Sequence, residues 1–216
     1  VKDMELPSGV ALITVDAAGE NSIVVAPGSN GNLQPEDIPS KILKAGKCDI
    51  LLLQLEIPIK TVEYATHTAS QYGIKVILNP APATSLPDDL FKHIWLITPN
   101  ETEAELLTGI RVHDVPSADD AAESFMKKGV QNVIITLGSA GAYVRSDKFT
   151  GMVPGIKVDA VDTTAAGDVF NGALAVAIAE GSDLEDAVQF ANKAAAISVT
   201  RLGAQASAPY RKEIDP

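Results

Sequence analysis

Short apolar runs alternate with amphipathic stretches along most of this chain. Runs of strand length occupy residues 49–54, 75–78, 95–98 and 132–136. Helical periodicity occupies residues 61–72, 101–108, 117–128, 169–180 and 184–200. The first two of these stretches end at Gly73 and Gly109, which are typical helix stops, and Ser117 is the expected N-cap of the third. Buried strands alternating with helices predict an α/β fold with a mostly parallel sheet covered on both faces.

Other segments depart from this alternation. Residues 9–15 and 21–26 are β-rich and flank a loop that contains glycine, which predicts a hairpin. A second hairpin is expected over 141–145 and 148–153, and a helix over 35–44. We therefore expect a small β element over residues 1–27 and one α/β core over residues 28–216.

Composition narrows the class of protein. The chain has 216 residues, of which 46% are hydrophobic, and its formal net charge is −11. This charge, without a basic run, argues against nucleic-acid or membrane-surface binding. The lone cysteine, Cys48, excludes an intrachain disulfide and is expected to be a buried core residue. We see no signal peptide and no stretch that could span a bilayer, so the expected location is the cytoplasm.

The candidate chemistry centres on residues 161–173. Three small residues, Ala165, Ala166 and Gly167, form a turn before a helix whose free N–H groups would attract an anion. Asp168 lies in the first helical turn, where it could take a proton from a hydroxyl beside that anion. The alternative is an ordinary loop before a helix with an acidic first turn. We favour the functional interpretation because the run is long and a second loop of this type occurs elsewhere.

That second loop spans residues 136–141 and contains two glycines, although alone it is an ordinary strand-to-turn connection. Asn100 and Glu103 form an N-x-x-E pattern that, taken alone, is a helix capping box. The chain has no G-x-x-x-x-G-K-[ST] segment and no protein-kinase motif set. The histidines, His67, His93 and His113, lack metal-ligand spacing.

The segment DTTAAGDVFNGALA over residues 162–175 closely resembles the DTxGAGD signature of the ribokinase-like (PfkB) sugar kinases. Ala165 stands where most of that family has glycine, a departure that points towards the ribokinases within it. The resemblance continues in one register through residues 79–83, 98–105, 136–141 and 200–205. It implies a three-layer α/β/α fold with a small β-hairpin lid.

The resemblance also implies an activity, the ATP-dependent phosphorylation of D-ribose to ribose 5-phosphate. Asp168 would be the catalytic base and would contact the sugar, and Ala165, Ala166 and Gly167 would hold the transferring phosphate. The implied ATP contacts are Asn100, Thr136, Leu137, Gly138, Ser139, Ala140, Gly141, Gly167, Asp168 and Asn192. Asn192 is equally readable as a polar residue on an Ala-rich helix. Glu56, the implied sugar contact, is equally readable as an exposed carboxylate at a strand end.

Two cations are implied beside ATP. Glu103 would help to position Mg²⁺ through water. A monovalent cation, typically K⁺, would be held by loops that contain Asp162, Thr164, Ser198, Arg201, Gly203 and Ser207. Most of these ligands would be backbone carbonyls, and Asp162 is the best candidate for a side-chain ligand.

The family's N-terminal part carries a Gly-Gly-Lys-Gly-type sugar motif that has no match here. We interpret the chain, which opens at Val1, as the C-terminal portion of such a kinase with an incomplete lid. In the family the lid pairs between subunits, so the resemblance allows a homodimer through the lid. Two alternatives stay open: a kinase of the same fold for a fructose derivative, deoxysugar or nucleoside, and a catalytically silent nucleotide-binding fragment.

Overall fold

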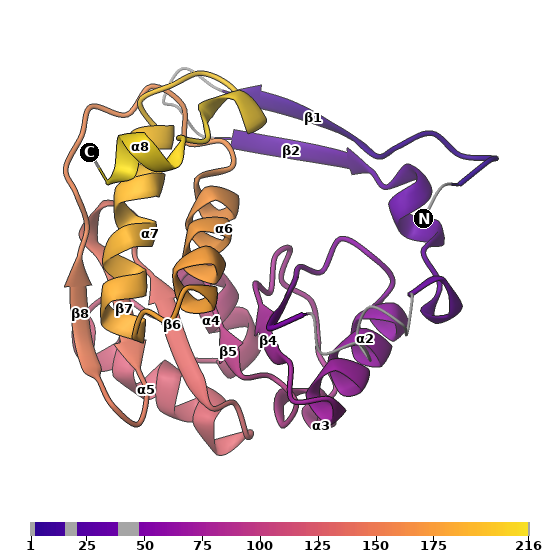
Figure 1. The fold of residues 1–216 in the computed structure, drawn as a ribbon, viewed down its shortest axis with the longest axis horizontal. Helices are drawn as coiled ribbons and strands as arrows, with labels where there is room; N and C mark the ends of the chain where they lie inside the picture. Colours follow the sequence, from indigo (N-terminus) through magenta and orange to yellow (C-terminus); the bar gives the residue numbers. More distant parts are fainter. Residues whose placement is uncertain (1–2, 16–20, 39–47, 216) are drawn as a thin grey trace.

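The computed structural model describes residues 3–15, 21–38 and 48–215, and these residues form two separate sheets (Figure 1). The main sheet has six strands in the order β3-β4-β5-β6-β7-β8. The strands are β3 (Ile50–Leu53), β4 (Lys75–Leu78), β5 (Leu96–Ile97), β6 (Asn132–Thr136), β7 (Gly141–Arg145) and β8 (Thr150–Pro154). Strands β3 to β6 are parallel, whereas β7 and β8 form an antiparallel hairpin after β6. The mostly parallel sheet expected from the sequence is confirmed.

Helices cover both faces of this sheet. One face carries α6 (Ala166–Ala179) and α7 (Leu184–Ser198). The opposite face carries α2 (Ile59–Gln71), α3 (Asp88–Phe91), α4 (Glu101–Thr108) and α5 (Val115–Lys127). Strand side chains alternate between the two layers: Ile134 packs with α6 and α7, and Ile135 packs with the other helices. The result is a three-layer α/β/α core (Figure 1).

The second sheet is the expected hairpin of β1 (Val10–Val15) and β2 (Asn21–Ala26), which are antiparallel. In Figure 1 it runs along the top of the view, and the start of β1 and the end of β2 lie on the side where the N-terminus is marked. Val10, Leu12 and Val24 are exposed. In the antiparallel register Leu12 pairs with Val24, and Val10 is two residues from Leu12, so the three side chains share one face.

Short elements complete the description. They are the 3-10 turns η1 (Gly28–Asn32), η2 (Pro35–Asp37), η3 (Gly138–Ala140) and η4 (Gln205–Ser207), and the helix α8 (Arg211–Ile214). The predicted helix over 35–44 is therefore a 3-10 turn over its first residues, and its remainder from 39 lies outside the described residues. Among the described residues, no helix is both long and apolar enough to cross a membrane.

Three sequence expectations are corrected in detail. The N-cap of α5 is Asp114 and not Ser117, because the Asp114 carboxylate accepts the Ser117 N–H at 2.9 Å and Pro116 fits the first helical turn. Ser117 is the third helical residue and completes the capping box. Helix α6 begins at Ala166, three residues before the expected start. Cys48 is half-buried, and its thiol donates to the Ile50 carbonyl at 3.1 Å.

Candidate active site

The parallel strands end along one edge of the main sheet, and polar residues follow each of them. Gln54 follows β3, Asn79 follows β4, Thr98 follows β5, and Thr136 is the last residue of β6. Ligands of open α/β sheets bind at this edge because the loops after the strands converge there. The residues implied by the motifs lie on these loops and on the first turn of α6.

The turn before α6 is built to leave backbone donors free. Ala165 is its N-cap and has φ 60°, which makes it the single non-glycine residue with positive φ in the described chain. The Ala166 N–H donates to the Thr163 carbonyl at 3.2 Å. The N–H groups of Gly167 and Asp168 donate to no acceptor in the described segments, and α6 has no side-chain cap. A helix start with free N–H groups is an anion site.

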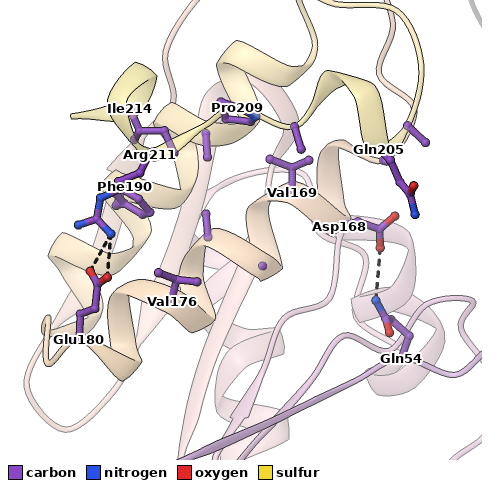
Figure 2. Close-up of a pocket in the computed structure, with 16 residues that line it drawn as sticks. Gln54, Asp168, Val169, Val176, Glu180, Phe190, Gln205, Pro209, Arg211 and Ile214 are labelled. Carbon is purple, nitrogen blue, oxygen red and sulfur yellow. Dashed lines mark hydrogen bonds and ion pairs between the residues drawn. The ribbon is translucent and has the colours of Figure 1, made fainter. Parts of the chain in front are cut away.

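Asp168 lies beside this turn with its carboxylate exposed to solvent. Its Oδ1 atom accepts a hydrogen bond from Gln54 Nε2 at 3.3 Å (Figure 2). Both residues line a cavity of about 780 Å³ that continues along α6 towards α7 and α8. A carboxylate at the mouth of a cavity, next to unpaired N–H groups, can act as a base on a hydroxyl held there.

The capping box at the start of α4 is confirmed. Asn100 Oδ1 accepts the Glu103 N–H at 2.8 Å, and Glu103 Oε2 accepts the Asn100 N–H at 2.9 Å. Glu103 is buried, and burial raises the pKa of its carboxyl group above the ordinary value. A nearby cation would offset this effect of burial on the pKa, since an opposite charge favours the ionised form of the carboxyl group.

The glycine loop over 136–141 lies directly beside this helix start. Asn100 and Thr136 form a parallel β-bridge, and the Thr136 N–H donates to the Pro99 carbonyl at 2.9 Å. The N–H groups of Gly138 and Ser139 have no acceptor in the part of the chain that the structure describes. The structure thus joins two motifs that the sequence separates by more than thirty residues, and leaves backbone donors on the exposed loop.

Asn192 is buried and reaches the strand next to this loop. Its Nδ2 atom donates to the carbonyl oxygens of Val153 at 3.4 Å and Pro154 at 3.1 Å. Pro154 pairs with Gly141 at the end of the loop. Asn192 therefore ties α7 to the region expected to hold the adenine, and its amide nitrogen is engaged in that tie.

Part of the expected monovalent-cation set is also brought together. The two Asp162 carboxylate oxygens accept the N–H groups of Thr164 and Gly203, each at 2.9 Å. A hydrogen bond from the Thr164 side chain is the main cause that lowers the pKa of Asp162 below its ordinary value, followed by the Gly203 and Thr164 N–H groups. The hydrogen bond from the Gly203 N–H to Asp162 also holds the loop before α6 against the loop after α7.

The side chains of Ser198, Ser207 and Arg201 already have partners in the described chain. Ser198 and Ser207 donate their hydroxyl hydrogens to the carbonyls of Ala195 and Ala204. The Arg201 guanidinium pairs with Glu213 at 2.6 Å. That the backbone carbonyls of these residues bind a monovalent cation stays a prediction.

Glu56 is exposed beyond β3 and has no hydrogen-bond partner among residues 3–15, 21–38 and 48–215. Its contact with a sugar stays a prediction. Sequence reasoning missed Gln54, two residues earlier, which touches Asp168 directly. The only available signal was that Gln54 is polar and follows an apolar strand at the ligand-binding edge.

The donor set at this edge limits how a metal could bind. No three His, Cys, Asp or Glu side chains in the described ranges form a group that could hold a metal ion. Mg²⁺ commonly keeps several waters and binds through one carboxylate and substrate phosphates. Glu103, a single buried carboxylate, fits that mode and does not fit an all-protein cage.

Comparison with known proteins places these motifs in context. A model of the family described as pfkB family carbohydrate kinase matches residues 1–211. The ribokinase of Haemophilus influenzae is 47% identical over 206 residues, a match that covers 95% of this chain and 67% of that protein.

Solved structures give the same result. The ribokinase of Thermotoga maritima superposes with a TM-score of 0.87 at 45% identity, over 97% of this chain and 69% of that one. The ribokinase of Arabidopsis thaliana complexed with ribose and ATP has a TM-score of 0.84 at 32% identity, again over 97% and 69%. The three-layer fold expected from the sequence is confirmed, and the chain spans about two thirds of the length of these relatives.

Proposed function

Since this chain belongs to the pfkB family of carbohydrate kinases and matches ribokinases along almost all of its length, we propose that it transfers the γ-phosphoryl group of ATP to the 5-hydroxyl of D-ribose. The observation that carries the proposal is the first turn of α6. There the free N–H groups of Gly167 and Asp168 lie beside an exposed carboxylate that faces a cavity.

In this proposal Asp168 removes the proton of the sugar hydroxyl as the oxygen attacks the γ-phosphorus. The Ala165–Gly167 turn and the Asp168 N–H then stabilise the charge on the transferring group. Gln54 donates to Asp168 Oδ1 and so orients the carboxylate. The bond that breaks joins the γ-phosphorus to the bridging oxygen of ADP, and the proton stays on Asp168 until product leaves.

The nucleotide would lie across the other loops of the same edge. In this proposal Asn100, Thr136 and the N–H groups of Gly138 and Ser139 would contact the phosphates and ribose, and Asn192 would border the adenine; the β-bridge between Asn100 and Thr136 and the bond from Asn192 to Pro154 support a shared site. The Arabidopsis ribokinase, which was solved in complex with ribose and ATP, supports ribose and ATP as the ligands. Mg²⁺ held through water by Glu103 would neutralise phosphate charge.

A monovalent cation, K⁺, is proposed between the two loops that Asp162 joins. Its ligands would be backbone carbonyls of the loops around Thr164, Ser198, Arg201, Gly203 and Ser207. Because both Asp162 oxygens already accept N–H groups, Asp162 would act mainly by holding the loops together.

We also propose that the reaction takes place in the cytoplasm, where ATP is supplied.

The substrate is tested with a panel of acceptors. We expect ADP formation from Mg·ATP with D-ribose to exceed that with 2-deoxy-D-ribose, D-fructose and nucleosides, with the product phosphorylated at the 5-position. A preference for another acceptor would reassign the substrate within the family. ATP binding without acceptor-dependent ADP release would contradict the kinase proposal and favour a silent nucleotide-binding protein.

A further inference from the structure

Two buried polar side chains link the anion-binding turn to the end of β5. Thr98 and Asn171 are each only 1% exposed. The Thr98 hydroxyl donates to Asn171 Oδ1 at 2.6 Å, and Asn171 Nδ2 donates to the Gly167 carbonyl at 2.9 Å. None of the roles assigned above uses these two side chains, although both are adjacent to the site.

The two hydrogen bonds form a relay of Thr98, Asn171 and Gly167, whose direction is set by which groups can donate and which can only accept. The Thr98 hydroxyl has a second acceptor, the Leu78 carbonyl, but at 3.5 Å this contact is much weaker than the one to Asn171. A carbonyl can only accept, so the Asn171 amide must present its NH₂ group to Gly167 and its oxygen to Thr98. The hydrogen bonds therefore run in one direction, from Thr98 to Asn171 to Gly167.

This direction matters for the peptide unit between Gly167 and Asp168. A carbonyl that accepts an additional hydrogen bond polarises its peptide unit, and chains of hydrogen bonds strengthen one another in a low-dielectric interior. The N–H at the other end of that unit belongs to Asp168, one of the two free donors of the turn. The relay thus strengthens a donor that faces the transferring phosphate.

The relay also fixes the turn relative to the nucleotide motif. Thr98 lies two residues before Asn100, and its carbonyl accepts Asn79 Nδ2 at 3.2 Å. Asn79 in turn follows β4 and donates its N–H to the Leu53 carbonyl at 2.9 Å. The ends of β3, β4 and β5 are therefore connected to the first turn of α6 by successive hydrogen bonds.

We propose that Thr98 and Asn171 are positioning residues, which hold and polarise the Gly167–Asp168 peptide so that its N–H binds the transferring phosphoryl group. The proposal rests on the proposed function and extends it from the residues that face the ligand to the buried pair behind them.

The variants follow from the geometry. Thr98→Val keeps the shape of the side chain and removes the donor, whereas Thr98→Ser keeps the donor. Thr66→Val is the matched control, because Thr66 is fully buried and its hydroxyl has no hydrogen-bond partner in the described chain. Each variant is first required to show the cooperative thermal unfolding of the wild type.

The first measurement is calorimetric binding of Mg·ADP, with and without aluminium fluoride as a phosphoryl mimic, in the presence of D-ribose and K⁺. We expect Thr98→Val to reduce the affinity gained from aluminium fluoride by about tenfold, less than the loss of a whole oxyanion donor. Its affinity for Mg·ADP alone stays within twofold, and Thr98→Ser and Thr66→Val keep the full gain. A full gain in Thr98→Val would overturn the proposal.

The second measurement does not depend on catalysis. We expect Thr98→Val to move the Asp168 amide proton to higher field in the ligand-free protein, since its peptide is less polarised, while Thr66→Val leaves it in place. If aluminium fluoride does not raise the affinity of the wild type for Mg·ADP, the proposed function fails. The shift of the Asp168 amide proton then tests the relay by itself. An unchanged shift in Thr98→Val overturns it in either case.

Discussion

Ala165 shows most directly how one residue sets the geometry of the site. Its φ of 60° lies in the left-handed region, where an L-residue with a Cβ atom is strained by roughly 1–2 kcal/mol. The conformation turns the chain so that the next N–H groups point out of the helix start. Backbone strain at this position is consistent with a role in holding an anion.

We predict that Ala165→Gly stabilises the protein by about 0.5 kcal/mol. Relief of the left-handed strain exceeds the extra backbone entropy that glycine loses on folding, which costs roughly 0.5–1 kcal/mol. Ala166→Gly is the control. Ala166 has ordinary helical geometry, so glycine there should lower the free energy of unfolding. Urea unfolding gives the free energy of unfolding of both variants. Equal destabilisation of the two would show that Ala165 is not strained.

The sequence predicted the residues of motifs better than their tertiary partners. The sequence singles out Asp168 and the turn before it because the run from 161 to 173 is contiguous. Gln54 and Thr98 were missed as partners of Asp168 and Asn171, because the contacts join residues 114 and 73 positions apart. No local periodicity reports such a pairing, since the sheet order alone decides which strand ends meet.

Among the elements, the glycine loop between β6 and β7 depends on close backbone packing. Gly141 has φ 104°, and a Cβ atom there would overlap the Val153 carbonyl oxygen and the Gly155 nitrogen. Gly138 also has positive φ, at 53°, but a Cβ atom there would meet nothing within 4 Å. Glycine is therefore required at position 141 for both space and backbone conformation, and at position 138 for backbone conformation alone.

We therefore predict that Gly141→Ala lowers the free energy of unfolding by about 3 kcal/mol, since overpacking and left-handed strain add. Gly138→Ala should cost about 1 kcal/mol, from strain alone. Chemical denaturation of both variants gives the comparison. Similar losses in the two would show that Gly141 is not closely packed against β8.

Helix α5 is tied to β7 by a carboxylate that should respond to acid. Asp119 accepts the Tyr143 hydroxyl at 2.6 Å and also pairs with Arg145, and the Tyr143 hydrogen bond is the main cause of its lowered pKa. Because the folded pKa lies below the ordinary 3.8, this contribution to stability is complete above that pH and is lost as pH falls below it.

We predict that Asp119→Asn loses less stability than the wild type between pH 4 and pH 3, because its amide does not titrate. Unfolding midpoints in urea across pH 3 to 6 test this, with Asp120→Asn on the same helix as the control. An acid limb as steep in Asp119→Asn as in the wild type would show that Asp119 carries none of the pH dependence.

At the scale of the whole molecule, the β1–β2 hairpin forms a sheet separate from that of the α/β core. Val10, Leu12 and Val24 expose their side chains on one face. Exposed apolar faces of this kind mark interaction surfaces. The sequence predicted the hairpin from two β-rich runs around a loop that contains glycine, but it could not predict whether the face packs on the core or is left open.

We propose that this face pairs with a second copy of the chain and predict that Leu12→Glu converts a dimer to a monomer. Leu106→Glu is the matched control, since Leu106 on α4 is 68% exposed, as is Leu12. Sedimentation equilibrium at micromolar concentration distinguishes the two states. A monomeric wild type, or a dimer that survives Leu12→Glu, would contradict a lid interface.

The central claim is that Asp168 serves as the base of a ribose kinase, and its most direct test is ADP release from Mg·ATP with K⁺, with and without D-ribose. We predict ribose-dependent release in the wild type and a loss of about 10²–10⁴-fold in Asp168→Asn, the range for removal of a general base. Mg·ADP affinity, measured by calorimetry, should stay within about twofold in that variant because the nucleotide loops are unchanged. Ribose-dependent turnover that persists in Asp168→Asn would contradict the account.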